Sequence, residues 1–161
     1  MPVATAGSRP SIHSLRGGRF IADVCPSSSI EIYLFSTFRI THIDFPLAGE
    51  KVAKVGATTG RTEATVLSTC ADINVNGTNI SLLCQGQAFW LGGTFPIAAK
   101  GDSGSPVFRV DRAADPFTTD VTLLGILWGG DKSGGVFGFS QLLLLEAELG
   151  FLSVCAPGFA C

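Results

Sequence analysis

The segment Gly101–Pro106, with the sequence Gly-Asp-Ser-Gly-Ser-Pro, holds the residues best suited to covalent chemistry. Glycines beside Ser103 let backbone N–H groups converge on one point without obstruction by a Cβ atom. A serine hydroxyl held outward by such a turn can attack a carbonyl carbon, and the N–H groups of Gly101 and Ser103 can stabilise the charge that develops on oxygen. Asp102 can anchor the turn by accepting hydrogen bonds or pairing with a cation. The same residue types are common in solvated turns, so the segment alone leaves both interpretations open.

A serine nucleophile also needs a base, which is most often a histidine oriented by a carboxylate. The chain contains two histidines, His13 and His42. His13 is the preferred candidate for the base, although its polar surroundings also suit a surface residue. His42 is the second candidate, and its alternative is an ordinary place in a strand or at a rim. Asp23, upstream of Ser103, is the candidate for the orienting acid, and a loop carboxylate that caps a turn is its alternative.

The composition predicts one compact β-rich domain with a hydrophobic core. Of 161 residues, 46% are hydrophobic and 15% charged, and 20 glycines and 8 prolines leave little room for long helices. The net charge of −2, without any run of lysines or arginines, argues against nucleic acid or an anionic membrane as a partner. No apolar run approaches the roughly 18 residues that cross a bilayer. Nothing in the sequence calls for a metal or another cofactor.

The secondary structure that must position this segment is predicted to be a series of short strands. Runs of β-branched and aromatic residues between turn signals predict strands over 30–43, 51–57, 58–70, 79–89, 106–110, 121–130 and 135–140. One helix is expected over 140–149, with Ser140 as its N-cap and Gly150 after its end. Short strands followed by a terminal helix indicate an all-β barrel.

The five cysteines lie at positions 25, 70, 84, 155 and 161 and include no Cys-x-x-Cys pair, which argues against a zinc or thioredoxin-type site. Cys70 and Cys84 flank two expected strands joined by an Asn-Gly turn. A disulfide between them would raise the free energy of unfolding by about 3 kcal/mol. Two glycosylation sequons, at Asn76 and Asn79, lie between them. Together these features favour a secreted protein. The start of the chain does not resemble a signal peptide and the number of cysteines is odd, so an upstream segment is expected.

Several of these segments together resemble the chymotrypsin-like (trypsin superfamily) serine proteases. The sequence GDSGSPVF at 101–108 resembles the nucleophile block of that family, and LLGILWGG at 123–130 its substrate-binding strand. The sequence VGATTGRTEATV at 55–66 is similar to the second barrel of the streptogrisin-like and related fungal secreted branch. The Cys70–Cys84 hairpin and the terminal helix also occur at the corresponding places. The resemblance covers roughly residues 46–150.

The resemblance implies a role for each matching residue. Ser103 would be the nucleophile, and the N–H groups of Gly101 and Ser103 would form the oxyanion hole. The segment Leu127–Gly129 would bind the peptide as an added strand, with Trp128 and Gly129 lining the primary pocket. Ile97, six residues before Ser103, would give that pocket an apolar character.

The same resemblance implies a chymotrypsin-like β-barrel fold in which residues 46–161 form a complete second barrel with the terminal helix. Residues 1–45 would be a shortened remnant of the first barrel or an irregular segment, because they are too few for six strands and their turns. A second barrel without its partner would expose an apolar face, through which association is expected. The implied activity is that of a serine endopeptidase acting on peptide or protein substrates through an acyl-enzyme on Ser103, with the base supplied by His13 or by a segment absent from this chain. The alternatives are a non-catalytic member that binds peptides and, outside the family, a glycosylated lectin or adhesin with a chance turn.

Overall fold

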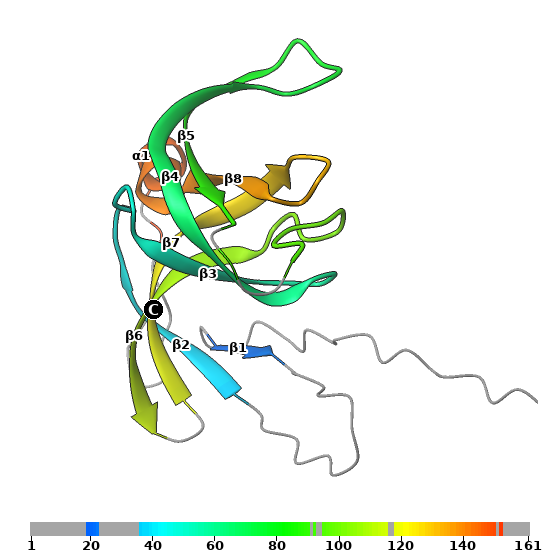
Figure 1. Ribbon diagram of the computed structural model, residues 1–161. Coiled ribbons are helices and arrows are strands. Elements are labelled where there is room, and N and C mark those ends of the chain that lie inside the picture. The colour runs from blue at the N-terminus through cyan, green and yellow to red at the C-terminus, as the bar shows by residue number, and fades with distance from the viewer. Residues whose placement is uncertain are drawn as a thin grey trace, which may run out of the picture.

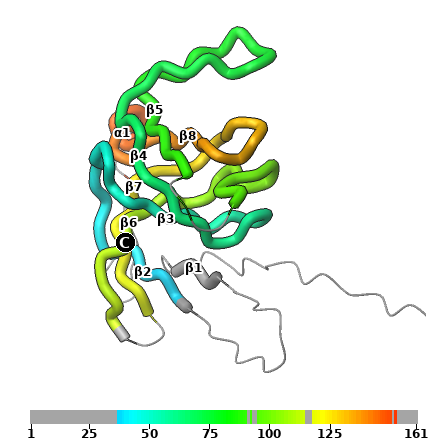
Figure 2. The backbone as a smooth tube through the Cα atoms, viewed as in Figure 1, coloured from blue at the N-terminus to red at the C-terminus, as the bar shows by residue number. Residues whose placement is uncertain are grey.

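The computed structural model describes residues 19–22, 36–90, 92, 95–115, 118–150 and 152, in eight strands and one helix. The strands are β1 (Arg19–Ala22), β2 (Ser36–Ile43), β3 (Lys51–Gly56), β4 (Gly60–Asn74), β5 (Ser81–Phe89), β6 (Pro106–Asp115), β7 (Thr118–Gly130) and β8 (Val136–Gln141). The helix, α1, spans Leu142–Leu149. The elements curve around a common centre, as the ribbon in Figure 1 and the tube in Figure 2 show. None of the helix residues described forms a segment long and apolar enough to cross a membrane.

The strands form one sheet that closes on itself. The order is β1-β2-β7-β6-β3-β4-β5-β8, and β7 also pairs with β8, so six strands from β3 to β8 make a ring. All pairs within the ring are antiparallel. Strand β2 lies outside the ring and pairs in parallel with the first half of β7. The predicted all-β barrel with a terminal helix is therefore confirmed.

The hydrophobic side chains divide between the two faces of this sheet. Strand β3 shows the division: Val52 points into the barrel interior, whereas Ala53 and Val55 point outward. The interior cluster consists of Val52, Ala64, Val66, Ala88, Ile97, Ala98, Val107, Leu124, Leu127, Phe137 and Phe139. The outer cluster consists of Phe38, Ile40, Ala53, Val55, Phe108, Val121, Leu123 and Leu142, from β2, β3, β6, β7 and α1. Strand β2 and the helix thus cover the outer face of the ring.

Strands β4 and β5 form a long hairpin that projects from the barrel (Figure 1). The predicted Cys70–Cys84 disulfide joins its two strands. The predicted Asn-Gly turn lies at its tip, where Gly77 has a φ of +79°, which a glycine adopts without strain. Asn76 and Asn79 of the two sequons are exposed there.

The helix begins later than the sequence predicts. Ser140, expected as the N-cap, belongs to β8, where it pairs with Ile126 and its hydroxyl group donates to Gln85 Oε1 at 2.8 Å. The ladder between β7 and β8 continues to Gln141, so Gln141 becomes the N-cap residue, without a side-chain capping bond. The prediction for the other end is confirmed: Gly150 terminates the helix with a φ of +93°.

Candidate active site

The loop that carries Ser103 runs from the barrel interior at Ile97 into β6. Two successive turns shape it, because the Asp102 N–H donates to Ala99 O and the Ser105 N–H donates to Asp102 O, both at 3.0 Å. Gly101 occupies the left-handed region, with a φ of +103°, which favours glycine at this position. The Ser103 side chain is exposed, and its hydroxyl group donates to Trp128 O at 3.0 Å.

Within the segment 101–105, the backbone N–H groups of Gly101 and Ser103 have no hydrogen-bond acceptor among the described residues, whereas those of Asp102, Gly104 and Ser105 are bonded. The carbonyl groups on the other side of the same two peptide units are both occupied. Lys100 O accepts the Thr58 hydroxyl group at 2.8 Å, and Asp102 O accepts the N–H and hydroxyl groups of Ser105. Because C=O and N–H point in opposite directions across a trans peptide unit, both N–H groups are turned away from these anchors.

Asp102 holds the loop to the barrel through a buried ion pair. Its Oδ2 lies 2.9 Å from the ammonium nitrogen of Lys54 in β3, and both side chains are fully buried. The same carboxylate accepts hydrogen bonds from the N–H groups of Thr58 at 2.8 Å and Ala99 at 3.0 Å. The Thr59 hydroxyl group donates to it at 2.7 Å. Asp102 therefore has the anchoring role that its place in the loop suggested.

The surroundings of this ion pair favour the charged carboxylate. Burial alone would raise the pKa of Asp102, but hydrogen bonds from Thr59, Lys54, Thr58 and Ala99 outweigh burial and lower the pKa from 3.8 to about 2. Burial lowers the pKa of Lys54, against the opposing effect of Asp102. A carboxylate that stays charged near neutral pH keeps the donors that surround it, and so keeps the Gly101–Ser103 backbone in place.

Sequence reasoning did not identify Lys54 as part of the site, although a signal was present. Successive side chains of a strand point to opposite faces, so Lys54 shares a face with Val52, which is buried in the barrel. A lysine on an interior face requires a buried anion. Only the fold shows that this anion is Asp102, which lies 48 residues further along the chain.

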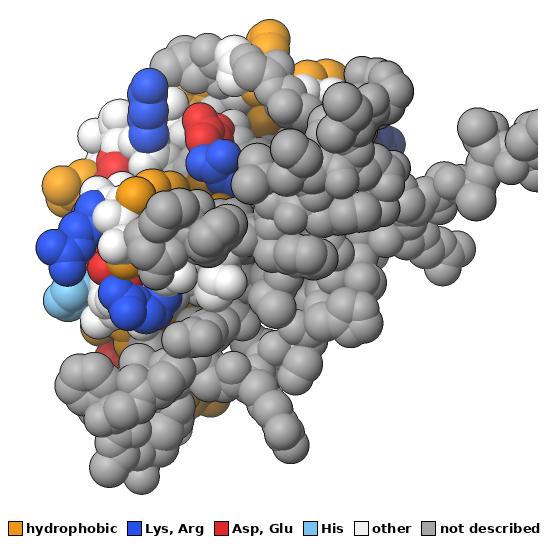
Figure 3. All heavy atoms as spheres, turned by 90° about the horizontal axis from the view of Figure 1, so that it is seen from below, with side chains coloured by type: hydrophobic (Ala, Val, Ile, Leu, Met, Phe, Trp, Pro, Cys, Tyr) orange, Lys and Arg blue, Asp and Glu red, His pale blue; other side chains and the backbone are white. Residues whose placement is uncertain are grey.

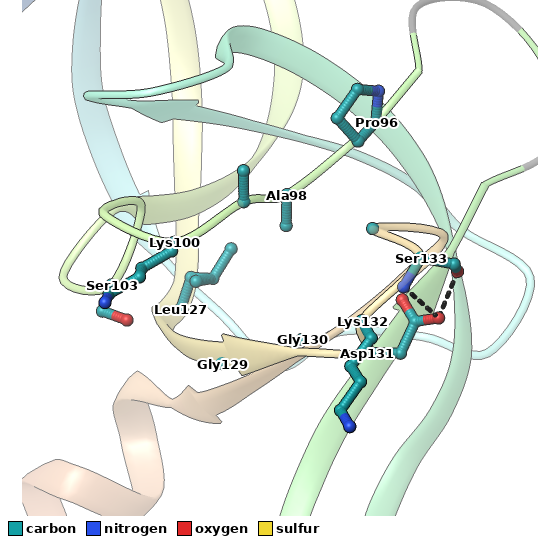
Figure 4. A pocket seen from close by; sticks show the side chains of 12 residues that line it. Pro96, Ala98, Lys100, Ser103, Leu127, Gly129, Gly130, Asp131, Lys132 and Ser133 are labelled. Carbon is teal, nitrogen blue, oxygen red and sulfur yellow. Dashed lines mark hydrogen bonds between the residues drawn. The ribbon is translucent and has the colours of Figure 1, made fainter.

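A pocket of about 410 Å³ adjoins Ser103. Its wall comes from the loop before Ser103, from the end of β7 and from the turn that follows β7. The residues that line it are Pro96, Ala98, Ala99, Lys100, Ser103, Leu127, Gly129, Gly130, Asp131, Lys132, Ser133 and Gly134. Figure 4 shows Ser103 at one end of the pocket and Asp131 and Ser133 at the other. Most of the lining residues are small, so a side chain of moderate size fits between them.

Ile97 does not line this pocket as the sequence comparison suggested. Its side chain is fully buried in the interior cluster, and its carbonyl oxygen accepts the Thr62 hydroxyl group at 2.7 Å. Because neighbouring side chains of an extended segment alternate in direction, Pro96 and Ala98 face the pocket instead. The small side chain of Ala98, rather than the bulk of Ile97, therefore bounds the cavity.

The segment Leu127–Gly129 lies beside Ser103, but Trp128 does not line the pocket there as the resemblance implied. Leu127 and Gly129 line the pocket, whereas Trp128 lines a second pocket of about 410 Å³ beneath the β4–β5 hairpin. The indole N–H of Trp128 donates to Gln85 Oε1 at 2.9 Å, which fixes the ring. The Leu127 N–H and C=O groups are both bonded to the nucleophile loop, at Ser105 O and Gly104 N. A peptide added to this strand would therefore pair beyond Leu127.

His42 is the one histidine within the described part of the chain, and it does not approach Ser103. It pairs in register with Thr122, six residues before Trp128 on β7, which corresponds to roughly 20 Å of extended strand. His42 lines a separate pocket with charged residues that include Asp44, Arg109 and Asp120. Figure 3 shows acidic and basic side chains and a histidine on the face seen from below. His13 and Asp23, the expected base and acid, lie outside the described residues, as do Cys25, Cys155 and Cys161.

The arrangement of strands is similar to that of several proteases of known structure. The chain aligns with a glutamic acid specific serine protease with a TM-score of 0.55 and 19% identity, over 88% of this chain and 70% of that one. It aligns with the chymotrypsin of Cellulomonas bogoriensis with a TM-score of 0.56 and 16% identity, over 85% of this chain and 63% of that one. For protease A of Thermobifida fusca the TM-score is 0.51 and the identity is 22%, over 71% of this chain and 54% of that one.

These similarities show that the chain has a chymotrypsin-like fold. The chain spans between 54% and 70% of the length of these three proteins. No protein-family model matches the chain, and no curated protein matches its sequence.

Proposed function

We propose that the chain is a serine-type endopeptidase that cleaves peptide bonds through an acyl-enzyme on Ser103. The observation that carries the proposal is the loop geometry: an exposed serine hydroxyl group shares a turn with two N–H groups, of Gly101 and Ser103, that have no acceptor among the described residues. The adjoining pocket and the chymotrypsin-like fold support the same function. The assignment of residues 1–45 to a remnant of a first barrel and of residues 46–161 to the second barrel belongs to this proposal.

The chemistry follows from these positions. The Ser103 hydroxyl oxygen attacks the carbonyl carbon of the scissile bond while a base takes its proton. The resulting oxyanion accepts hydrogen bonds from the Gly101 and Ser103 N–H groups, which are already oriented and need no rearrangement. The C–N bond then breaks, and the amine leaves with the proton that the base returns. Water attacks the ester on Ser103 in a second round, which releases the acid and restores the hydroxyl group.

We assign the role of base to His13, with Asp23 as the carboxylate that orients it. The described residues contain no alternative, because His42 lies far along β7 from Ser103. The hydrogen bond from Ser103 to Trp128 O cannot replace a base, since a backbone carbonyl does not take up a proton near neutral pH. In the active complex the hydroxyl group must turn from Trp128 to the imidazole.

The substrate is a peptide or protein. One side chain enters the pocket beside Ser103, and the adjacent backbone pairs with β7 beyond Leu127. The neighbours of known structure are proteases, and the protein carries a disulfide of the kind that persists in oxidising surroundings. We therefore place the enzyme outside the cell, with Asn76 and Asn79 as sites for glycans. Association through an apolar barrel face, expected for a second barrel without its partner, also belongs to this proposal.

The test is hydrolysis of a mixed peptide library by the whole protein, read by mass spectrometry. The proposal expects peptide-bond cleavage by the parent and none by Ser103→Ala. The parent and Ser103→Ala should have equal unfolding midpoints, because the Ser103 side chain is exposed. Equal cleavage by both proteins would contradict the assignment of Ser103.

A second candidate function is peptide binding without turnover. The observation in its favour is that no imidazole approaches Ser103 in the described part of the chain. This candidate expects peptides to bind beside Ser103, with equal affinity for the parent and Ser103→Ala, and to remain intact. Cleavage that depends on Ser103 excludes it.

A further inference from the structure

The two N–H groups of the proposed oxyanion hole are secured to different degrees. The Ser103 N–H belongs to the peptide unit whose carbonyl group, on Asp102, accepts both the N–H and the hydroxyl group of buried Ser105. The Gly101 N–H belongs to the Lys100–Gly101 unit. Among the described residues, one donor holds the carbonyl group of that unit, the Thr58 hydroxyl group at 2.8 Å.

The Lys100–Gly101 peptide unit needs such a restraint. Glycine adopts positive and negative φ values about equally readily, and both Lys100 and Gly101 are exposed. Rotation of this peptide unit would exchange the directions of its C=O and N–H groups. The Gly101 N–H would then point toward Thr58 and away from a substrate oxyanion, while the Lys100 carbonyl oxygen would face that oxyanion and repel it.

Thr58 is itself well fixed for this task. Its own N–H donates to Asp102 Oδ1 at 2.8 Å, and Asp102 is held by the buried ion pair with Lys54. Thr58 and the loop are also in close contact, because a Cβ atom on Gly101 would lie 2.6 Å from Thr58 Oγ1. The hydroxyl group thus extends from a rigid turn directly to the movable peptide unit.

We propose that Thr58 is a positioning residue whose hydroxyl group keeps the Gly101 N–H turned toward the oxyanion. This inference rests on the proposed endopeptidase function. Thr58 is not among the residues that line the pocket beside Ser103, so we expect its effect in the transition state, in which the oxyanion forms, and not in substrate binding. A role limited to folding would instead change stability and leave the turnover of the folded enzyme as it was.

The test compares Thr58→Val, which keeps the shape and removes the hydroxyl group, with the parent on one cleaved peptide. Loss of one oxyanion donor costs about 100-fold to 1000-fold in kcat. Because the peptide unit of the variant still samples the correct orientation, we expect a fall of about tenfold to 100-fold in kcat and a KM within about twofold. Thr58→Ser, which restores the hydroxyl group, should recover kcat to within about threefold of the parent.

Thr62→Val is the matched control. It makes the same substitution in the next strand and removes a hydrogen bond to another backbone carbonyl group, that of Ile97, but it leaves Lys100 untouched. Its kcat should equal that of the parent even if its unfolding midpoint falls. Equal kcat values for Thr58→Val and the parent would overturn the inference, as would a failure of Thr58→Ser to recover activity.

Inactivation by a fluorophosphonate supplies a second readout, because the phosphoryl oxygen of the adduct occupies the same two N–H groups. The second-order rate constant should fall in Thr58→Val in parallel with kcat. A parent protein that neither cleaves peptides nor reacts with the reagent would overturn the proposed function, and this inference with it. A reactive parent with an equally reactive Thr58→Val overturns the role of Thr58 alone.

Discussion

Replacing Lys54 by methionine tests how the nucleophile loop is held. Methionine has a similar length and suits an apolar interior, but it leaves the Asp102 carboxylate without its cation. Both side chains of the pair are fully buried and their charged atoms are 2.9 Å apart, so water cannot replace the missing charge. Lys51→Met is the matched control, because Lys51 lies on the same strand with its side chain exposed.

The cost follows from the burial of the pair. Removing one partner of a buried ion pair costs about 3–5 kcal/mol, because the other charge stays buried without compensation. Asp102 keeps the hydrogen bonds from Thr58, Thr59 and Ala99, so we expect the lower end of this range, about 3 kcal/mol. For a protein of this size that loss lowers Tm by about 6–12 °C. Lys51→Met should change the free energy of unfolding by less than about 0.5 kcal/mol.

The pH dependence gives the same prediction a second signature. In the parent, the pKa of Asp102 is about 2, below its ordinary value of 3.8. This difference corresponds to roughly 2–3 kcal/mol of stability, which is present above about pH 4 and is lost as the pH falls toward 2. In Lys54→Met the uncompensated carboxylate has a raised pKa and takes up a proton more readily. The stability gap between the two proteins should therefore narrow as the pH is lowered from 7 to 4.

The assay is urea unfolding of the parent, Lys54→Met and Lys51→Met at pH 7 and pH 4, with the disulfide intact. A Lys54→Met protein as stable as Lys51→Met at pH 7 would refute the claim that the ion pair holds the loop. A gap that stays constant down to pH 4 would refute the assignment of the lost stability to Asp102.

Three further predictions concern the hairpin, the core and the proposed base. Reducing the Cys70–Cys84 disulfide should lower the free energy of unfolding by about 3 kcal/mol, measured by urea unfolding with and without reductant; an unchanged midpoint would show that the cross-link contributes nothing. Gly86→Ala should lower the free energy of unfolding by about 1–3 kcal/mol, because the added Cβ would lie 2.3 Å from the ring of buried Phe139. Gly129→Ala, where nothing lies within 4 Å, should leave the thermal midpoint almost unchanged, and equal midpoints for the two variants would count against the packing described here. His13→Ala should abolish peptide cleavage while His42→Ala retains it, and the reverse pattern would contradict both the assignment of His13 and the separation of His42 from Ser103.

The sequence was sufficient to predict those features that depend on local pattern. Alternating apolar residues predicted the strands of the barrel. The Asn-Gly pair predicted the turn at the tip of the β4–β5 hairpin, where Gly77 lies in the left-handed region. The position of Gly150 gave the end of the helix. The Gly-Asp-Ser-Gly motif placed Ser103 in an exposed turn, since glycine and short polar residues encode turn geometry directly.

Features that depend on distant contacts were beyond the reach of local pattern. The partner of Asp102 is Lys54, which only the closure of the barrel brings to the loop. The helix begins after Ser140 because β7 extends the ladder with β8 to Gln141. Ile97 faces the interior and not the pocket because its segment approaches the barrel with that side turned inward. In each case contacts between distant segments determine the partner, boundary or side-chain direction, and the local sequence does not.

The most direct measurement of the central claim is the site of reaction with a fluorophosphonate, found by mass spectrometry of the intact and digested protein. If the loop presents an activated hydroxyl group beside two oriented N–H groups, the folded protein gains one phosphonyl adduct, on Ser103, and Ser103→Ala gains none. A correctly folded protein that stays unmodified, or an adduct on another residue that persists in Ser103→Ala, would contradict the account.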